Sequence, residues 1–502
     1  MPNNQFGDFQ TPLELAESCI SKLAIPEESR ILEPTCGRGS FLQAAKNLYP
    51  EVERKGIEIC EEYAEQASEF GDVVTADVFT FEFRRLPWKN GGRIYVIGNP
   101  PWVTASDLKR MGSTNIPTKS NFKGVRGFDA ILGGSNFDIC EFIILQMIYA
   151  FNNEPMTLGM LCKTQVVRNV IEYAAKHNFP IENARIYRID AKKWFNAAAD
   201  ACFFVMDSDP STVGDYRCLE YESLDATEPL KTFGYVSGRL VSDTEAYEAN
   251  KDIDGTSPVQ WRSGIKHDAS KVYELKEVDG EILSSEGDVF ESSDEAIYPL
   301  MKSSDLAKGR RDCGKWVIVP QRKLGADTEV LKETSPKVWE YLNKHAETLS
   351  GRQSSIYAGK PRFSIFGIGD YTFAPYKVAI SGLYKEPSFQ LIGTESGKPI
   401  MFDDTCYMLS FETPETAAVV WAILEGQECR NLINSLYFRD AKRPITKKLL
   451  QRIDFSKVKE SGDSILNKAQ AEAERLGLPF DQQKAKASHE SIRQYCTPTL
   501  FS

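Results

Sequence analysis

The stretch ILEPTCGRGSFL, residues 31–42, combines the end of a strand, a glycine-rich turn and the start of a helix. Two apolar residues lead into the acid Glu33, and the chain then turns through residues 36–39 toward a helical pattern that begins near Ser40. Glycines in such a turn let the backbone approach a ligand closely, and open α/β sheets bind ligands at the carboxyl ends of their strands. Many strand–turn–helix units carry this turn for geometry alone, so the acid is the more informative feature. A carboxylate beside a helix N-terminus disfavours pyrophosphate and favours a cationic ligand, such as an ammonium or a sulfonium group.

Strand-like and helical stretches alternate on both sides of this turn over the first two hundred residues. Strands separated by about 20–25 residues, with helices between them, are typical of a parallel, doubly wound sheet. The sequence therefore predicts an α/β fold with a Rossmann-like, mostly parallel sheet. The expected strands lie at 30–34, 55–59, 72–77, 93–98, 158–163, 184–190 and 201–207.

The second and third predicted strands also end in acids. Glu58 is placed to accept hydrogen bonds from ribose hydroxyls, although an isolated acid there can equally be a solvated strand end. Asp77 could accept a bond from an adenine amino group while Val78 or Phe79 packs on the ring. Together these residues describe an adenosine pocket with no place for phosphate, which favours S-adenosylmethionine over NAD or ATP.

The stretch IGNPPW, residues 97–102, closes the fourth predicted strand with an unusual set of residues. The Asn99 Oδ1 atom and the Pro100 carbonyl can both accept hydrogen bonds from one NH₂ group, and the Pro100–Pro101 pair fixes the backbone. Trp102 offers a face on which a planar base could stack. Two acceptors on one amine make its nitrogen more nucleophilic, so a methyl transfer there needs positioning and no His or Cys base. The alternative is a strand exit that is merely stiffened by prolines.

In this order, these stretches resemble the gamma-type amino-group DNA methyltransferases, especially the N6-adenine enzymes of restriction–modification systems. QFGDFQTP, residues 5–12, matches the family's FxTP-like stretch, and Asn99–Trp102 matches its catalytic tetrapeptide, with Trp in place of the usual Tyr or Phe. Asn in the first place favours adenine over N4-cytosine as the target. The resemblance implies S-adenosylmethionine as the cofactor, with Thr11 and Pro12 at its methionine end, Glu33, Thr35, Gly37 and Gly39 along it, Glu58 at its ribose, and Asp77 with Val78 at its adenine.

Two further matches to the family are weaker. Phe142, in SNFDICEFI (135–143), is a candidate contact to the cofactor ring, with a core aromatic as the more frequent alternative. Phe195, in KKWFNAAADACFFVM (192–206), is a candidate to stack on the flipped base opposite Trp102, or else packs in the core. Residues 103–137, rich in Gly, Ser, Asn and Lys, are expected to form a substrate-facing lid or a plain surface insertion.

Composition narrows the class of protein. The 502 residues are 42% hydrophobic and 26% charged, as in ordinary globular proteins. No apolar run approaches the ~20 residues of a membrane helix. The eleven cysteines form no CxxC pair and only four histidines are present, so the sequence predicts neither a metal site nor a disulfide framework. These features are typical of a protein in the reducing cytoplasm.

Charge is segregated along the chain, although the net charge is −11. Residues 207–300 hold 22 Asp and Glu against 8 Lys and Arg, whereas residues 301–377 hold 14 Lys and Arg against 8 Asp and Glu. Such a local basic segment can bind nucleic acid despite a negative total. We expect a catalytic domain at 1–245, a mixed α/β target-recognition domain at 246–460 and a helical tail at 461–502.

The basic half also interleaves Lys and Arg with Phe and Tyr, which suits phosphate contacts and base-edge contacts. Each such cation, taken alone, is more often an ordinary solvated surface charge. The candidates for contact with DNA are Arg310, Arg322, Lys323, Arg362 and Lys377.

The sequence thus predicts an enzyme that methylates N6 of an adenine extruded from double-stranded DNA, with any restriction endonuclease encoded separately. Three alternatives use part of the same reasoning. A protein glutamine methyltransferase and an RNA base methyltransferase would share the NPPW pocket. A non-catalytic DNA specificity subunit would keep the fold, but it has no use for the complete set of Glu58, Asp77 and Asn99.

Overall fold

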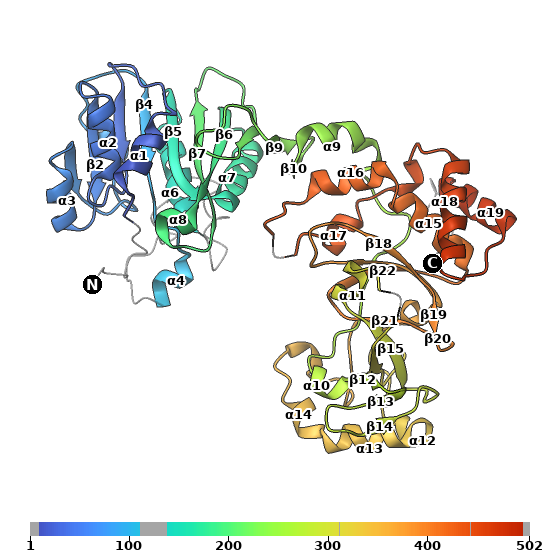
Figure 1. Ribbon diagram of the computed structural model, residues 1–502. Helices are drawn as coiled ribbons and strands as arrows, with labels where there is room; N and C mark the ends of the chain where they lie inside the picture. The colour runs from blue at the N-terminus through green and yellow to red at the C-terminus, as the bar shows by residue number, and fades with distance from the viewer. Residues whose placement is uncertain (1–9, 111–137, 311, 442, 495–502) are drawn as a thin grey trace. The chain divides into compact units, whose positions relative to one another are not determined.

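The computed structural model describes residues 10–110, 138–310, 312–441 and 443–494. The chain divides into two compact units, Met1–Glu245 and Ala246–Ser502, which Figure 1 colours blue to green and green to red. The boundary lies within helix α9 (Thr244–Asn250). In the described residues, no helix has the length and apolarity needed to cross a bilayer.

A ten-stranded sheet forms the centre of the first unit. Its strands are β1 (Arg30–Glu33), β2 (Glu53–Glu58), β3 (Asp72–Thr75), β4 (Ile94–Gly98), β5 (Met156–Lys163), β6 (Ile181–Asp190), β7 (Asp200–Ser208), β8 (Arg217–Tyr221), β9 (Lys231–Val236) and β10 (Arg239–Val241). They lie side by side in the order β10-β9-β8-β6-β7-β5-β4-β1-β2-β3. The α/β class predicted from the sequence is confirmed.

The strand order reverses between β1 and β4, which pair in parallel. From β1 the chain moves outward to β2 and β3, and from β4 it moves to β5 in the opposite direction, all in parallel pairs. Such a switch point opens a crevice at the carboxyl ends of the central strands, where ligands bind in this class of sheet. Strand β7 is inserted antiparallel between β5 and β6, a departure from the parallel rhythm.

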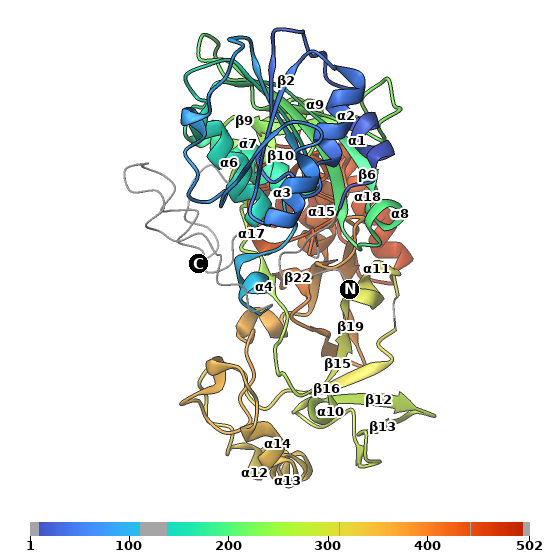
Figure 2. The same ribbon diagram turned by 90° about the vertical axis from the view of Figure 1, so that its left-hand side faces the viewer.

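Helices cover both faces of this sheet. Figure 2 shows α1 (Leu13–Ile20) and α2 (Ser40–Leu48) on one side and α6 (Ile139–Ala150) and α7 (Thr164–Lys176) on the other. Phe41 of α2 packs in a core cluster with Tyr95 of β4 and Phe203 of β7. The remaining elements here are α3 (Glu61–Ala67), η2 (Phe83–Arg85), α4 (Ala105–Arg110) and α8 (Ala191–Phe195).

The second unit contains two larger sheets. A four-stranded antiparallel sheet has the order β11-β22-β17-β18, and a six-stranded sheet has the order β14-β13-β12-β16-β15-β21. Strands β19 (Thr394–Glu395) and β20 (Lys398–Pro399) form a separate pair. The bounds of the sheet strands are β11 (Arg262–Ser263), β12 (Glu274–Val278), β13 (Glu281–Leu283), β14 (Val289–Phe290), β15 (Ile297–Met301), β16 (Lys315–Ile318), β17 (Tyr376–Ser381), β18 (Phe389–Ile392), β21 (Met401–Phe402) and β22 (Cys406–Phe411).

Helices of the second unit gather around each sheet. Trp316 of β16 and Leu342 of α13 (Pro336–Lys344) share one core cluster. Helix α15 (Pro414–Leu424) packs against β17 and also against α18 (Gly462–Arg475) and α19 (Gln482–Arg493). The C-terminal helices are therefore part of the second unit rather than a separate tail. The other helices are α10 (Ser270–Tyr273), α11 (Ser303–Ala307), α12 (Leu331–Thr334), α14 (Ala346–Ser350), α16 (Gln427–Leu436) and α17 (Lys447–Leu450), with 3-10 turns η4 (Lys251–Ile253), η5 (Ser355–Tyr357), η6 (Asp370–Phe373) and η7 (Phe455–Lys457).

Candidate active site

The glycine turn lies where the sequence predicted it, between β1 and α2. Gly37 and Gly39 have φ values of 51° and 84°, in the left-handed region that glycine adopts without strain. A Cβ atom on Gly39 would stand 2.9 Å from the Cα atom of Ala67, the last residue of α3, so no larger residue fits. The turn therefore brings bare backbone to the crevice at the switch point.

Glu33, the last residue of β1, is buried directly beneath this turn, with 3% of its surface exposed. Its carboxylate accepts a hydrogen bond from the backbone N–H of Leu42 at 3.2 Å. Burial raises the pKa of Glu33 well above the ordinary value, and the nearby Glu58 carboxylate raises this pKa further, while the Leu42 bond lowers it. A buried acid with so little compensation is suited to a cationic ligand.

Gly98, at the end of β4, makes room for that acid. Its φ is 148°, and a Cβ atom there would stand 3.2 Å from the Glu33 Cγ atom. Sequence reasoning gave Gly98 no role, because only the fold brings the ends of β1 and β4 together. The residue allows the acid of β1 and the tetrapeptide after β4 to share one crevice.

Glu58 joins β2 to the glycine turn. One carboxylate oxygen accepts the N–H of Gly37 at 2.8 Å, and the other accepts the N–H of Cys60 at 2.9 Å. Thr35 precedes the glycine turn on the same loop as Gly37, and its Oγ1 atom is buried without a hydrogen-bond partner among the described residues. A polar atom in that state is expected to meet a polar ligand group.

Asp77 follows β3 and shapes the next part of the crevice. Its Oδ1 atom accepts the N–H of Phe79 at 3.0 Å, and the Val78 carbonyl accepts Gln146 Nε2 of α6 at 2.7 Å. Phe142, also on α6, is fully buried and meets Phe79 edge-on with ring centroids 5.6 Å apart. Its contact with the cofactor ring stays a prediction.

Asn99 begins the tetrapeptide, and Thr11 orients its side chain. Asn99 Nδ2 donates to Thr11 Oγ1 at 3.1 Å, and Thr11 is 7% exposed. Because a carboxamide is planar, fixing Nδ2 also fixes the direction of Oδ1. Pro12 is the N-cap of α1, so the start of this helix positions Thr11, the hydrogen-bond partner of Asn99. Residues 5–9 of the matching FxTP-like stretch lie outside the described residues.

Trp102 and Phe195, the two candidates for stacking on a base, lie in direct contact with each other. Their ring centroids are 5.1 Å apart at an interplanar angle of 70°. The indole Nε1–H donates to the Leu161 carbonyl of β5 at 3.2 Å, and Trp102 is 6% exposed. A base held between two parallel rings needs them about 7 Å apart, since each contact takes about 3.5 Å. The two rings leave no such gap here.

Two further contacts at this site carried no clear sequence signal. Gln10 Oε1 accepts the N–H of Arg38 in the glycine turn at 3.3 Å. Lys163, the last residue of β5, forms an ion pair of 2.9 Å with Asp138, the N-cap of α6. Long-range pairs such as these depend on the strand order, which the sequence does not state directly. The expected lid at 103–137 lies outside the described residues from residue 111 onward.

The five predicted DNA contacts differ in their surroundings. Arg322 is exposed and lies over the Phe373 ring at 4.1 Å, and Arg362 is exposed beside Asn343. Arg310 and Lys323 form ion pairs with the acids Asp305 and Asp370, at 3.5 and 3.6 Å.

The position of Lys377 contradicts the prediction made from the sequence. The lysine is the second residue of β17 and 1% exposed, and its Nζ atom donates to the carbonyls of Ala374 and Ile400 at 2.9 and 3.0 Å. The prediction that it contacts DNA is wrong. Burial lowers its pKa to about 7.

Comparison with known proteins decides the family. No family model matches the chain. The Type II methyltransferase M.NspV from Nostoc sp. is 36% identical over 463 residues, which cover 90% of this chain and 96% of that protein. The chain belongs to the Type II methyltransferases.

Two other proteins are similar to this methyltransferase. The modification methylase CviBIII of a Paramecium bursaria Chlorella virus is 32% identical over 200 residues, which cover 38% of this chain and 46% of that protein. Among solved structures, the Type IIL restriction–modification enzyme MmeI in complex with DNA matches with a TM-score of 0.54 at 13% identity, over 96% of this chain and 73% of that one. The last match is a likeness of fold. The predicted membership in the methyltransferases of restriction–modification systems is confirmed.

Proposed function

We propose that this methyltransferase transfers the methyl group of S-adenosylmethionine to N6 of an adenine that is flipped out of double-stranded DNA. The observation that carries the proposal is the juxtaposition at the switch point. The Asn99 carboxamide, oriented by Thr11, follows β4, and the buried Glu33 ends the neighbouring strand β1. In this proposal, the site for the cationic cofactor and the site for the amine lie side by side.

The residues of the crevice fit S-adenosylmethionine. The carboxylate of Glu33 could pair with its ammonium group, and the turn at Gly37 and Gly39 leaves room for the cofactor to approach the backbone. Thr35 Oγ1 is a buried atom that could form a hydrogen bond with the cofactor. Glu58 ends β2 and Asp77 follows β3, in the order that ribose and adenine would require. Bound there, the cofactor would supply an electrophilic methyl group on a sulfonium sulfur.

The tetrapeptide would hold the amine that receives this methyl group. Asn99 Oδ1 and the Pro100 carbonyl accept its two hydrogens, which directs the nitrogen lone pair away from the ring and toward the cofactor. Catalysis then comes from orientation and fixed dipoles. As the new N–C bond forms, the S–CH₃ bond of the sulfonium would break to leave a thioether, and the amine would release one proton to solvent. Adenine is the proposed target, and N4 of cytosine is the competing one.

Base flipping is part of the proposal, because an amine inside a duplex cannot reach this crevice. Trp102 and Phe195 would stack on the extruded base. Their direct contact means that Phe195, at the end of the short helix α8, would first swing aside. The second unit would bind the DNA, and MmeI, whose fold is similar, was solved with DNA. A separately encoded restriction endonuclease is the expected partner.

Modification-aware sequencing tests the proposal. The chain is expressed in a host free of DNA methylation, with Asn99→Ala as the matched variant. We expect N6-methyladenine at one short motif for the wild type and none for the variant. Methylcytosine at that motif would reject the choice of base, and identical unmodified genomes would reject the proposed function.

A further inference from the structure

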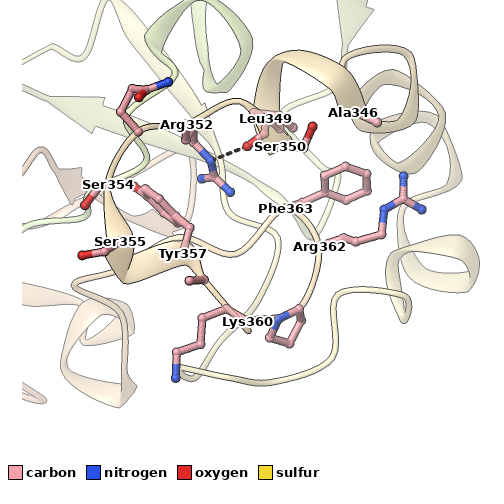
Figure 3. A pocket seen from close by; sticks show the side chains of 13 residues that line it. Ala346, Leu349, Ser350, Arg352, Ser354, Ser355, Tyr357, Lys360, Arg362 and Phe363 are labelled. Carbon is pink, nitrogen blue, oxygen red and sulfur yellow. Dashed lines mark hydrogen bonds between the residues drawn. The ribbon is translucent and has the colours of Figure 1, made fainter.

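A cavity of about 450 Å³ lies in the second unit, between α14 and the loop of residues 351–363 that contains η5. Its lining comes from one continuous stretch, from Ala346 to Phe363. Figure 3 shows the three cationic side chains of this lining, Arg352, Lys360 and Arg362, at separate points around the hollow. We call it the cationic cavity, because its lining residues include these three cations and no Asp or Glu.

The three cations form no ion pair with a carboxylate of the described residues, whereas Arg310 and Lys323 each do. Lys360 and Arg362 are both exposed. Unneutralised cations gathered around one hollow attract an anion.

Arg352 is fixed in place by its neighbours. Its guanidinium lies over the Tyr357 ring at 3.7 Å. Nε donates to the Leu349 carbonyl at 2.9 Å, and Nη1 donates to the carbonyls of His267 and Ser364 at 3.1 and 2.9 Å. These bonds use Nε and Nη1, and the Nη2 atom carries two further N–H donors. Arg352 thus braces the loop and still offers donors.

Arg362 is presented by strained backbone. The next residue, Phe363, has a φ of 63°, which a bulky residue adopts only when its surroundings force it. The Phe363 carbonyl accepts the Tyr273 hydroxyl at 2.7 Å, and the Arg362 carbonyl accepts the Thr328 hydroxyl. The Arg362 guanidinium lies 4.7 Å from the Phe363 ring. The strained residue therefore lies next to Arg362 in the lining of the cavity.

The chemistry of the cavity favours a phosphate group over a base. The rings of Tyr357 and Phe363 already carry guanidinium groups, so they are poor platforms for stacking. What the cavity offers instead is a set of N–H donors from two guanidinium groups and an ammonium group, which match phosphate oxygens.

We propose that the cationic cavity binds the phosphodiester backbone of DNA and so positions the second unit without reading sequence. This inference rests on the proposed function, since it assumes a DNA substrate. Contacts to phosphate fix the register of a protein on a duplex, whereas contacts to base edges select the sequence. The cavity would therefore act on target and non-target DNA alike.

The test measures DNA affinity against salt concentration for the wild type, Lys360→Gln and Arg362→Gln. Lys486→Gln, an exposed lysine on α19, is the charge-matched control. Each enzyme is titrated with two duplexes of equal length, one with the methylation motif and one without. We expect each cavity variant to lower the slope of log K against log salt by about 0.9 and to weaken binding about eightfold at ~0.1 M salt, equally for both duplexes. The control should match the wild type.

Several outcomes would overturn the inference. Unchanged salt slopes in both cavity variants would do so, as would a loss confined to the duplex with the motif, which would indicate base reading. A third arm uses thermal melting with inorganic phosphate. Stabilisation of the wild type alone, with unchanged DNA slopes, would assign the cavity to a free anion and reject DNA. Methylation by the wild type is measured in parallel, so that failure of the inference stays distinct from failure of the proposed function.

Discussion

Thr11 lies outside the tetrapeptide, but its hydroxyl orients the Asn99 carboxamide on which the proposed methyl transfer depends. It lies in the loop before α1 and accepts a hydrogen bond from Asn99 Nδ2. We expect Thr11→Val to lower kcat about 10- to 100-fold, because the carboxamide is free to turn once its partner is lost. Thr11→Ser keeps the hydroxyl and should retain most of the activity. Steady-state methylation assays measure both, and equal rates for the two variants would contradict this role.

Gly98 is a second position where an added side chain should change both stability and activity. Because its φ is 148° and its Cβ would press on Glu33, we expect Gly98→Ala to lower the free energy of unfolding by about 1–3 kcal/mol and to abolish methylation. Gly91→Ala is the matched control, since nothing lies within 4 Å of a Cβ there. Urea denaturation compares the two. A Gly98→Ala protein as stable and active as the control would reject the close approach.

Glu33 gives the crevice a pH dependence of known sign. Its pKa is raised in the folded protein, so the fold holds this proton at pH values where the unfolded chain has released it. The free energy of unfolding therefore falls as pH rises through that window, by at most about 1.4 kcal/mol per pH unit from this group. Conversely, affinity for a cationic cofactor should rise with pH, because the ionised carboxylate is the form that pairs with it.

Glu33→Gln isolates this effect. We expect the variant to bind S-adenosylmethionine about 10- to 100-fold more weakly, as for the loss of a hydrogen bond to a charged group. Its affinity should also no longer rise with pH. Calorimetric titrations at several pH values provide both results. A variant that retains the wild-type pH dependence would remove Glu33 from the cofactor site.

At the scale of single elements, strand β17 places a lysine where no charge is expected. The pKa of Lys377 is lowered to about 7 by burial, so between pH 7 and its ordinary pKa of 10.5 the unfolded chain binds more protons than the fold. The free energy of unfolding should rise with pH in that window, by up to about 1.4 kcal/mol per unit from this group. Lys377→Met should lack this rise, whereas the exposed Lys385→Met should keep it. Urea denaturation at three pH values measures the free energy of unfolding of each protein, and a rise with pH in Lys377→Met equal to that of the wild type would contradict this prediction.

Elements also show what the sequence could predict. The strands β1 to β7 follow from apolar runs and their spacing. The acids that end β1 and β2 or follow β3, which are Glu33, Glu58 and Asp77, follow from their positions alone. The antiparallel direction of β7 could not be predicted, because the composition of an apolar run does not show which way the strand runs in the sheet. Strands β8 to β10 lie in acidic, turn-rich sequence that gave no strand signal.

Lys377 was misjudged for a related reason. Strand β17 is buried on both faces, with Val378 and Ala379 both at 0% exposure, so its residues do not alternate between polar and apolar sides. A lysine in such a strand looks like a surface cation until its neighbours are known. Contacts between distant segments, such as Gly98 with Glu33, were likewise invisible before the strand order was known.

At the scale of the whole molecule, two compact units divide the chemistry. The crevice at the switch point lies in the first unit, and the cationic cavity and Arg322 lie in the second. We expect Asn99→Ala to abolish methylation while DNA affinity stays within about threefold. An Arg322→Gln, Lys360→Gln, Arg362→Gln triple variant should lose DNA affinity by at least about 50-fold at ~0.1 M salt while S-adenosylmethionine affinity is unchanged. Binding titrations with each ligand would show whether the two properties separate, and a joint loss in either variant would contradict the division.

The contact between Trp102 and Phe195 has a practical consequence. One of the seven indoles of the chain lies against a phenyl ring that, in the proposed base flipping, the incoming nucleobase would displace. Any such displacement changes the quenching environment of that indole, so its emission becomes an intrinsic optical reporter. Rapid-mixing fluorescence could thereby time nucleotide entry without a label, and a Phe195→Leu enzyme would give the baseline for the trace.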